Sequence, residues 1–289
     1  MKSKVLLNAC LAAIIGALTF MYSCSEDDPA EPTISLSETQ ITAKAGETIK
    51  VTVTMTAEAG FNKLIVTKLW DGSAQNTDEI TNITGNSYEF EYEVLVDDAD
   101  YILSFNFKVV DKDGREAQAE LVVEVELTMT QLLLKYDWLL ADEVRVKTGE
   151  SDISDPYTDD VYRFHADGSY DKSIGDKADS FSDLWFNYCY WNLNEETGML
   201  IMTRTGAFLE DVRDTVNITK IDAEVMEGDV IYRGLDAFNT GGEAVPYEPV
   251  EEYVKKFAAQ AKGSNFDPYM PGPDDDDTGP AKACNDIDW

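Results

Sequence analysis

Aromatic side chains between positions 181 and 191 are the residues whose type and spacing best suit ligand binding. They are Phe181, Trp185, Phe186, Tyr188, Tyr190 and Trp191. Aromatic rings offer large, rigid surfaces against which sugar rings can stack. On a regular strand, Trp185, Cys189 and Trp191 share one face, and Phe186, Tyr188 and Tyr190 share the other. One face has to fill a core, so the other is either a glycan-binding platform or a second buried face. The candidate ligand-binding residues are therefore Trp185, Tyr188, Tyr190 and Trp191.

A catalytic centre finds little support in the sequence. There is no Gly-x-Ser-x-Gly motif, no glycine-rich phosphate loop and no Cys-x-x-Cys pair. The single histidine, His165, falls in a strand-like segment beside a turn, which indicates a barrel-wall or surface residue rather than a general base. A carboxylate pair for glycoside hydrolysis stays open as an alternative, but no spacing among the 56 acidic residues marks one. We expect no enzymatic activity, no cofactor and no metal centre.

The net charge argues against two classes of partner. The 289 residues include 23 Lys and Arg against 56 Asp and Glu, a formal net charge of −33 at pH 7. Nucleic-acid binding needs a basic surface that releases counterions, and anionic lipid attracts basic segments. We therefore expect no nucleic-acid partner, and any attachment to a membrane has to arise in another way.

The N-terminal segment offers such an attachment. Two lysines precede an apolar stretch over residues 5–22, which is typical of a secretory signal. The Ser23-Cys24 pair that follows resembles the end of a bacterial lipoprotein signal, in which the cysteine becomes the lipidated first residue. The resemblance implies a signal peptide over residues 1–23, lipidation of Cys24 and an acidic tether over residues 24–33. A membrane-spanning anchor is the alternative.

The acidic run behind Cys24 resembles a second signal. Cys24-Ser25-Glu26-Asp27-Asp28 is similar to the export signal that carries Bacteroidota lipoproteins to the outer face of the outer membrane. A solvated linker is the alternative interpretation of the same residues. The resemblance implies a lipid-anchored outer-membrane protein that faces the cell exterior.

Two of the four cysteines remain once the signal is removed and Cys24 is acylated. They are Cys189 and Cys284, and they lie in a compartment where disulfides can form. A disulfide between them would attach the C-terminal tail to the second domain. Alternatively, Cys189 is a free cysteine in a core, because free cysteine often acts as a small buried residue.

Residues 34–127 are predicted to form a β-sandwich. Apolar side chains alternate with polar ones along residues 49–55, 88–94 and 101–109, with turns between them. About six or seven strands in this length are typical of a sandwich. Asp97-Asp98-Ala99-Asp100-Tyr101 resembles the corner before the penultimate strand of immunoglobulin-like domains, with Leu103 where a cysteine is usual. The domain thus resembles a disulfide-free, Ig-like module.

Residues 128–245 are predicted to form a second all-β domain. Strand-like segments joined by tight turns indicate an antiparallel meander or barrel. Four features resemble the lipocalin-like domains of Bacteroidota lipoproteins, namely an isolated Trp138, the hairpin 162–170, the Tyr-Trp-x-Leu strand 190–193 and the strand 216–221. The resemblance implies a small antiparallel barrel or half-barrel, and it names no ligand.

Residues 246–289 are predicted to form a short helix and an acidic tail. Val250, Val254 and Phe257 would share one side of a helix over residues 249–262. Prolines, glycines and four consecutive aspartates follow, a composition that cannot bury a core.

Three functions are compatible with this organisation. The first is a non-enzymatic surface lipoprotein that binds a polysaccharide as an accessory to glycan capture, with the Ig-like module as a spacer. The second is a lipocalin-like carrier of a small apolar ligand, which requires an open, apolar barrel interior. The third is an envelope or adhesive protein that acts through protein contacts. We favour the first.

Overall fold

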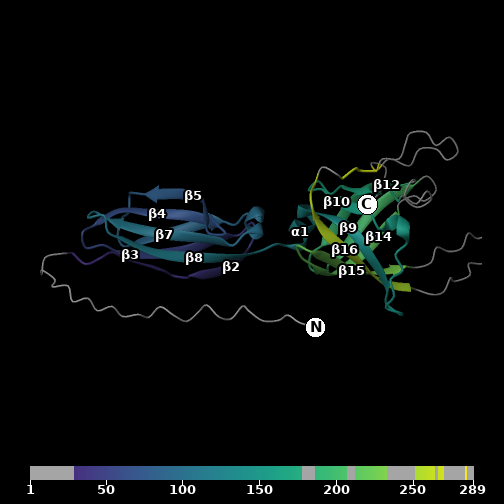
Figure 1. Cartoon of the computed structure of the whole chain (residues 1–289), viewed down its shortest axis with the longest axis horizontal. Coiled ribbons are helices and arrows are strands. Elements are labelled where there is room, and N and C mark those ends of the chain that lie inside the picture. The colour runs from purple at the N-terminus through teal and green to yellow at the C-terminus, as the bar shows by residue number, and fades with distance from the viewer. Residues whose placement is uncertain are drawn as a thin grey trace, which may run out of the picture. The chain divides into compact units, whose positions relative to one another are not determined.

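The computed structural model describes residues 29–177, 186–206, 212–232, 251–263, 266–269 and 284. The predicted all-β class is confirmed, with an Ig-like sandwich and an antiparallel barrel (Figure 1). The chain divides into two compact units, and each sheet system is described by itself. Cys24, Phe181, Trp185 and the aspartate run 274–277 lie outside the described residues, as does the predicted signal peptide.

The sandwich consists of a three-stranded and a five-stranded antiparallel sheet. The first has the order β1 (Thr33–Leu36), β3 (Thr48–Thr56), β6 (Ser87–Glu93). The second has the order β2 (Gln40–Lys44), β8 (Glu116–Glu126), β7 (Leu103–Asp111), β4 (Phe61–Trp70), β5 (Ser73–Ile80). The ring of Phe90 in β6 lies 4.9 Å from that of Phe105 and 5.1 Å from that of Phe107, both in β7. These aromatic contacts join the two sheets in one apolar core.

The predicted corner precedes β7 but is built differently from the motif that it resembles. Residues Val96–Asp100 form a 3-10 helix, η1, in which Asp98 is fully buried. The Asp98 carboxylate accepts hydrogen bonds from the Tyr92 hydroxyl at 2.7 Å and from the Leu95 backbone N–H at 2.9 Å. Tyr101, the tyrosine of the motif, is 43% exposed. Burial, together with the Asp98 carboxylate, raises the pKa of Tyr92, the tyrosine that packs at this corner.

The β7–β8 turn buries a second carboxylate. Asp111 is fully buried and accepts hydrogen bonds from the backbone N–H groups of Asp113 and Arg115, at 3.0 and 2.8 Å. The Nε of Arg115 also donates to Asp111, at 2.8 Å. Gly114 has a φ of +83°, which the turn requires and which glycine adopts without strain. The Asp111 carboxylate is therefore part of a hairpin turn.

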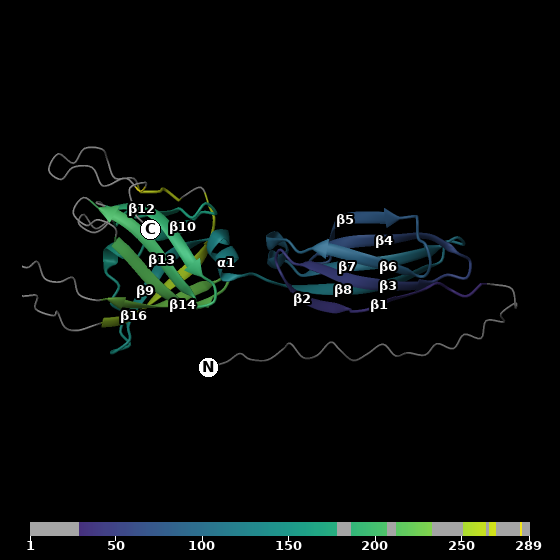
Figure 2. The same ribbon diagram turned by 180° about the vertical axis from the view of Figure 1, so that it is seen from behind.

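The second sheet system is an eight-stranded, nearly closed barrel. Helix α1 (Met129–Lys135) leads into it, and η2 (Asp155–Tyr157) lies between its first two strands. Its order is β11 (Tyr170–Ser173), β10 (Val161–Phe164), β9 (Tyr136–Arg145), β16 (Glu251–Ala261), β15 (Val225–Tyr232), β14 (Val212–Ile221), β13 (Met199–Gly206), β12 (Phe186–Asn194). The two ends of this order meet through a bridge between Ser169 and Tyr190 and a bond from the Trp191 N–H to the Gly168 carbonyl at 2.8 Å. Each strand thus neighbours the next along the chain, and β16 returns to β9 (Figure 2).

The helix predicted over residues 249–262 is wrong, because Glu251–Ala261 form strand β16. Tyr253 and Phe257 are buried, and Lys255 lies between them on the same face. This charged residue conceals the apolar alternation, so the pattern favoured a helix. The strand pairs with β15 on one side and β9 on the other, which satisfies backbone groups of both neighbours. The predicted end of the barrel domain at residue 245 is therefore also wrong.

Most of the barrel interior is filled by apolar side chains. Trp138, on β9, is fully buried at the centre of this core. The other core members are Leu133, Leu140, Phe164, Tyr170, Leu200, Met202, Val216, Ile218, Met226, Val230 and Phe257. An open, apolar interior, which the carrier hypothesis requires, is not what these residues form.

Candidate functional site

The predicted aromatic cluster does not form one exposed platform. The β12–β13 register shifts between Tyr188 and Tyr190, so Cys189 occupies a bulge. Because a bulge adds one residue to a strand, it reverses the alternation of the side chains that follow. Tyr188 and Trp191 consequently both pack against the barrel core. The prediction that they lie on opposite faces is wrong for this reason.

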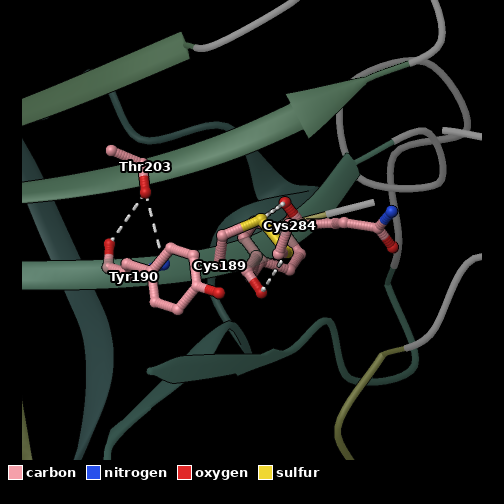
Figure 3. Close-up of a disulfide and its surroundings, with 6 residues drawn as sticks. Cys189, Tyr190, Thr203 and Cys284 are labelled. Carbon is pink, nitrogen blue, oxygen red and sulfur yellow. Dashed lines mark hydrogen bonds between the residues drawn. A yellow bond between two sulfur atoms is a disulfide. The ribbon is translucent and has the colours of Figure 1, made fainter. Parts of the chain in front are cut away.

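The contacts of Trp191 and Tyr190 are those of barrel-wall residues. The Trp191 indole N–H donates to the His165 carbonyl at 3.0 Å, and its ring lies edge-on to Phe164 with centroids 5.4 Å apart. The Tyr190 backbone N–H and carbonyl both bond the Thr203 hydroxyl, each at 3.2 Å (Figure 3). The fourth candidate, Trp185, lies outside the described residues.

A disulfide joins Cys189 and Cys284, as one of the two hypotheses for these residues predicted. Their Cα atoms are 5.4 Å apart, and Figure 3 shows the bond next to Tyr190. Cys189 is 2% exposed, so it is buried as well as bonded. The alternative of a free core cysteine is wrong.

His165 lies on the outside of the barrel wall. Its Nε2 is 2.8 Å from the Asp171 carboxylate, and 37% of its side chain is exposed. It follows the core residue Phe164 and precedes the β10–β11 turn. This position is the one predicted from its neighbours in the sequence.

A buried ion pair inside the barrel was not predicted from the sequence. Lys172 alternates on β11 with the core residue Tyr170, so both side chains point inward. The Lys172 ammonium lies 2.7 Å from the Asp160 carboxylate, and the two side chains are 6% and 1% exposed. Buried lysine is rare unless it is paired, so this pair marks an unusual part of the interior.

Tyrosine rings surround the Lys172 ammonium. The rings of Tyr157, Tyr162 and Tyr188 have centroids 5.7, 5.7 and 5.5 Å from its Nζ atom. These distances are within the range in which a cation is attracted to the face of a ring. Burial raises the pKa of the neighbouring Tyr170 well above its ordinary value. The Tyr170 hydroxyl therefore stays neutral at physiological pH.

A second ion pair lies at the same level of the barrel. Arg204 alternates on β13 with the core residue Met202, and Asp214 lies opposite Met202 on β14. The Arg204 Nε donates to Asp214 at 2.8 Å, and its guanidinium lies 4.1 Å from the Phe186 ring centroid. Burial alone would lower the pKa of Arg204, but the Asp214 carboxylate outweighs this effect and raises it. The two side chains are 24% and 40% exposed.

These four residues form what we call the charged layer: Asp160, Lys172, Arg204 and Asp214. The layer occupies the end of the barrel at which β11 and β13 end and at which β10, β12 and β14 begin. Apolar side chains fill most of the remaining interior, to which the inward face of β16 adds Lys255, 3.5 Å from the Glu143 carboxylate. Carboxylates, a guanidinium, an ammonium and tyrosine rings can together hydrogen-bond and stack against a polar, cyclic ligand. The signal available in the sequence was charge at inward positions of strands, which apolar alternation does not reveal.

Two other kinds of site are absent from the described residues. Among them, no three His, Cys, Asp or Glu side chains gather in a way that could hold a metal ion. Within the same residues, no helix has the length and apolar composition needed to cross a membrane.

Comparison with known proteins assigns the chain to no family. No protein-family model and no curated protein matches it. One similar solved structure is a CARDB domain from Pyrococcus furiosus in complex with di-metal ions, at 12% identity over 34% of this chain and 96% of that one, with a TM-score of 0.21. Another is extracellular domains 3–5 of Drosophila OTK, at 11% identity over 70% of this chain and 75% of that one, with a TM-score of 0.27. Neither similarity is strong enough to bear on the function of this chain.

Proposed function

We propose that this chain is a non-enzymatic lipoprotein of the outer membrane, anchored through Cys24 and facing the cell exterior, that binds a glycan in its barrel. The observation that carries the proposal is the charged layer. The lipid anchor and the surface location rest on the resemblance of residues 1–28 to a lipoprotein signal with an acidic export sequence. The glycan is proposed from the chemistry of the layer.

The energetic cost of the charged layer supports a role in binding. Moving two charges out of water costs several kcal/mol per ion, and the mutual attraction of the pair often only offsets that cost. Replacing a buried ion pair by apolar residues of similar size often leaves a protein equally stable or makes it more stable. The pair of Lys172 with Asp160 is almost fully buried, so stability alone does not account for it. A ligand that uses these groups does.

The groups of the layer suit hydroxylated rings better than apolar ligands. Sugar hydroxyls both donate and accept hydrogen bonds, and Asp160, Lys172, Arg204 and Asp214 offer both kinds of partner. An apolar ligand placed here would separate charged groups from water without replacing any hydrogen bond, which is unfavourable. The apolar part of the interior is already filled by side chains such as Trp138 and Phe257. The apolar-carrier alternative is therefore the weaker one.

The test of glycan binding compares two double variants of the chain from residue 25 onward. Lys172→Met with Asp160→Leu removes the buried pair. Lys50→Met with Glu91→Leu removes an exposed sandwich pair whose atoms are 2.6 Å apart and serves as the matched control. Gel retardation and tryptophan fluorescence are measured against plant, host and microbial polysaccharides. We expect one glycan class to retard the unaltered chain and the control, but not the barrel variant.

Two outcomes would count against this proposal. Retardation that survives in the barrel variant would move the binding site away from the charged layer. No response to any glycan would favour the third hypothesis, in which the chain acts through protein contacts. The anchor is tested separately, since Cys24→Ala should abolish labelling with radioactive palmitate and release the protein from membranes.

A further inference from the structure

A pocket lies on the outer wall of the barrel, and none of the four residues of the charged layer lines it. Trp138 and Tyr162 pack into the interior, so Asp137 and Val161, their neighbours on β9 and β10, face outward. The pocket has a volume of about 290 Å³. This is the lower end of the roughly 300–1,000 Å³ of small-molecule sites, so it suits a ligand of about one sugar residue. Residues that line it include Asp137, Val161, Ser173, Gln260, Ala261 and Phe266.

The chain that follows β16 forms one wall of this pocket. The Arg163 guanidinium donates to the Gly263 carbonyl at 3.1 Å and lies 4.1 Å from the centroid of the Phe266 ring. The Tyr269 backbone N–H then donates to the Lys172 carbonyl at 2.9 Å. Residues 263 and 266–269 therefore lie against β10 and β11, and the Phe266 ring is fixed at the edge of the pocket.

The charged groups beside the pocket neutralise one another. Asp137 is 3% exposed, and its two oxygens accept hydrogen bonds from Arg163 Nε and Nη2 at 2.8 and 2.6 Å. The guanidinium already donates to this carboxylate and to the Gly263 carbonyl, so it contributes little net charge for binding an anionic ligand. A free cation would in turn compete with Arg163 for Asp137. The pocket consequently favours an uncharged ligand.

Two polar side chains in the pocket remain available to a ligand. Ser173 is 8% exposed on the outer face of β11, and its side chain lines the pocket. The carboxamide of Gln260, on the outer face of β16, makes no side-chain hydrogen bond to any described residue. A hydroxyl and a carboxamide can each both donate and accept a hydrogen bond. Both groups line the same pocket, so one ligand can satisfy both.

We propose that this outer pocket binds a neutral sugar residue that carries an acylamino group, such as an N-acetylhexosamine. The Gln260 carboxamide can donate to the acyl carbonyl and accept from the amide N–H. The acyl methyl group fits the apolar side chains of Val161 and Ala261, and the Phe266 ring offers a surface for the sugar ring. The Ser173 hydroxyl pairs with a ring hydroxyl. The site shares no side chain with the charged layer, so it does not depend on glycan binding by that layer.

The test measures binding of free monosaccharides to the chain from residue 25 onward. N-acetylglucosamine and N-acetylgalactosamine are compared with glucose and galactose by saturation-transfer NMR and calorimetry. Ser173→Ala and Gln260→Ala remove the two available polar groups. Gln75→Ala, at an exposed position of β5, is the matched control. We expect the acetylated sugars alone to bind, with affinity about tenfold weaker in each pocket variant and unchanged in the control.

The outcomes separate this site from the charged layer. The Lys172→Met/Asp160→Leu variant should bind the acetylated sugars normally even if its polysaccharide binding is lost. Equal binding of glucose would overturn the acylamino specificity. Absence of binding, or binding that survives both Ser173→Ala and Gln260→Ala, would overturn the site itself. Loss of folding is checked by the thermal midpoint, which Gln260→Ala should leave unchanged because Gln260 is an exposed position of β16.

Discussion

Two ion pairs with a buried carboxylate, one in the sandwich and one in the barrel, have different roles. In the sandwich, Asp111 and Arg115 are four positions apart, and the carboxylate also accepts two backbone N–H groups of its own turn. In the barrel, Asp160 and Lys172 meet inside the bore, 2.7 Å apart and surrounded by tyrosine rings. The first pair builds a hairpin turn. The second builds no turn, which is why we connect it with ligand binding.

The two cores differ in the same way. Asp98 and Asp111 are fully buried in the sandwich, and both are satisfied by groups from adjacent turns. The barrel instead combines an apolar core with a charged layer at one end of its interior. The buried aspartates Asp98 and Asp111 thus lie where strands of the sandwich begin or end, whereas Asp160 and Lys172 lie in the interior of the barrel. Matched changes in the two regions should therefore have different effects.

Reduction of the disulfide should have the largest effect and should be confined to the barrel. Cys189 and Cys284 are 95 residues apart, and constraining a loop of this length stabilises a fold by about 4–5 kcal/mol in the chain-entropy model. The chain from residue 25 onward contains no other cysteine. Adding reductant should therefore lower the denaturant midpoint of the barrel transition and leave the midpoint of the sandwich transition unchanged. Equal movement of both transitions, or of neither, would contradict this assignment.

Lys172→Met should destabilise the barrel by about 3–5 kcal/mol, because it leaves the Asp160 carboxylate buried without its cation. Adding Asp160→Leu should recover most of that loss, since an apolar pair of similar size replaces an ion pair at little cost. The quantity to measure is the free energy of unfolding in urea for the unaltered chain, the single variant and the double variant.

The equivalent change in the sandwich should have a different outcome. Arg115→Met with Asp111→Leu should not recover stability, because the Asp111 carboxylate also accepts the turn N–H groups. If the sandwich double variant recovered its free energy of unfolding, or if the barrel double variant did not, the two pairs would not differ in the way that we infer.

Two glycines in tight turns should differ in their tolerance of alanine. Both have a positive φ, +71° at Gly198 in the barrel and +83° at Gly114 in the sandwich. A Cβ at Gly198 would lie 2.5 Å from the Ile218 carbonyl oxygen, whereas one at Gly114 would meet nothing within 4 Å. Gly114→Ala should therefore cost about 1–2 kcal/mol from φ alone, and Gly198→Ala should cost about 1–3 kcal/mol more from overpacking. The thermal midpoints of the two variants measure these costs. An equal fall of the two midpoints would contradict the predicted clash at Gly198.

The sequence predicts the sandwich better than the barrel because the sandwich strands alternate regularly. Tyr88, Phe90 and Tyr92 lie on β6 as predicted, and β3 and β7 also follow their apolar patterns. Strand β5 was missed, because Ser73–Ile80 has a polar sequence with both faces exposed over most of its length. Asp71 and Gly72, with φ of +49° and +76°, form the turn before it. An Asp-Gly pair after a strand is a hairpin signal, so this strand was predictable.

The candidate sites were less predictable, for physical reasons. The bulge at Cys189 reverses which face of β12 the following side chains occupy, and no local sequence pattern predicts this bulge. Strand β16 depends on partners more than a hundred residues earlier in β9. Lys172 and Arg204 are brought into one layer by the closure of the barrel, which a single strand does not encode. The outer pocket likewise needs Phe266 to lie back across β10.

Acid should act on both regions, with a smaller effect than any of the changes above. Hydrogen bonds from Arg145, and then from the Tyr253 hydroxyl, hold the pKa of Asp152 in the barrel below its usual value of 3.8. Burial alone would raise the pKa of Asp111, but its hydrogen bonds from Arg115 and Asp113 outweigh burial and lower it. A lowered pKa means that the stabilisation is present above the ordinary pKa and is lost as the pH falls through the folded value. Unfolding midpoints measured from pH 7 to pH 2 should therefore be steady at first and then fall below about pH 4. Asp152→Asn should weaken this acid dependence for the barrel transition and leave that of the sandwich, whereas Asp111→Asn should do the reverse. If either variant changed both transitions equally, the two carboxylates would not act within separate regions.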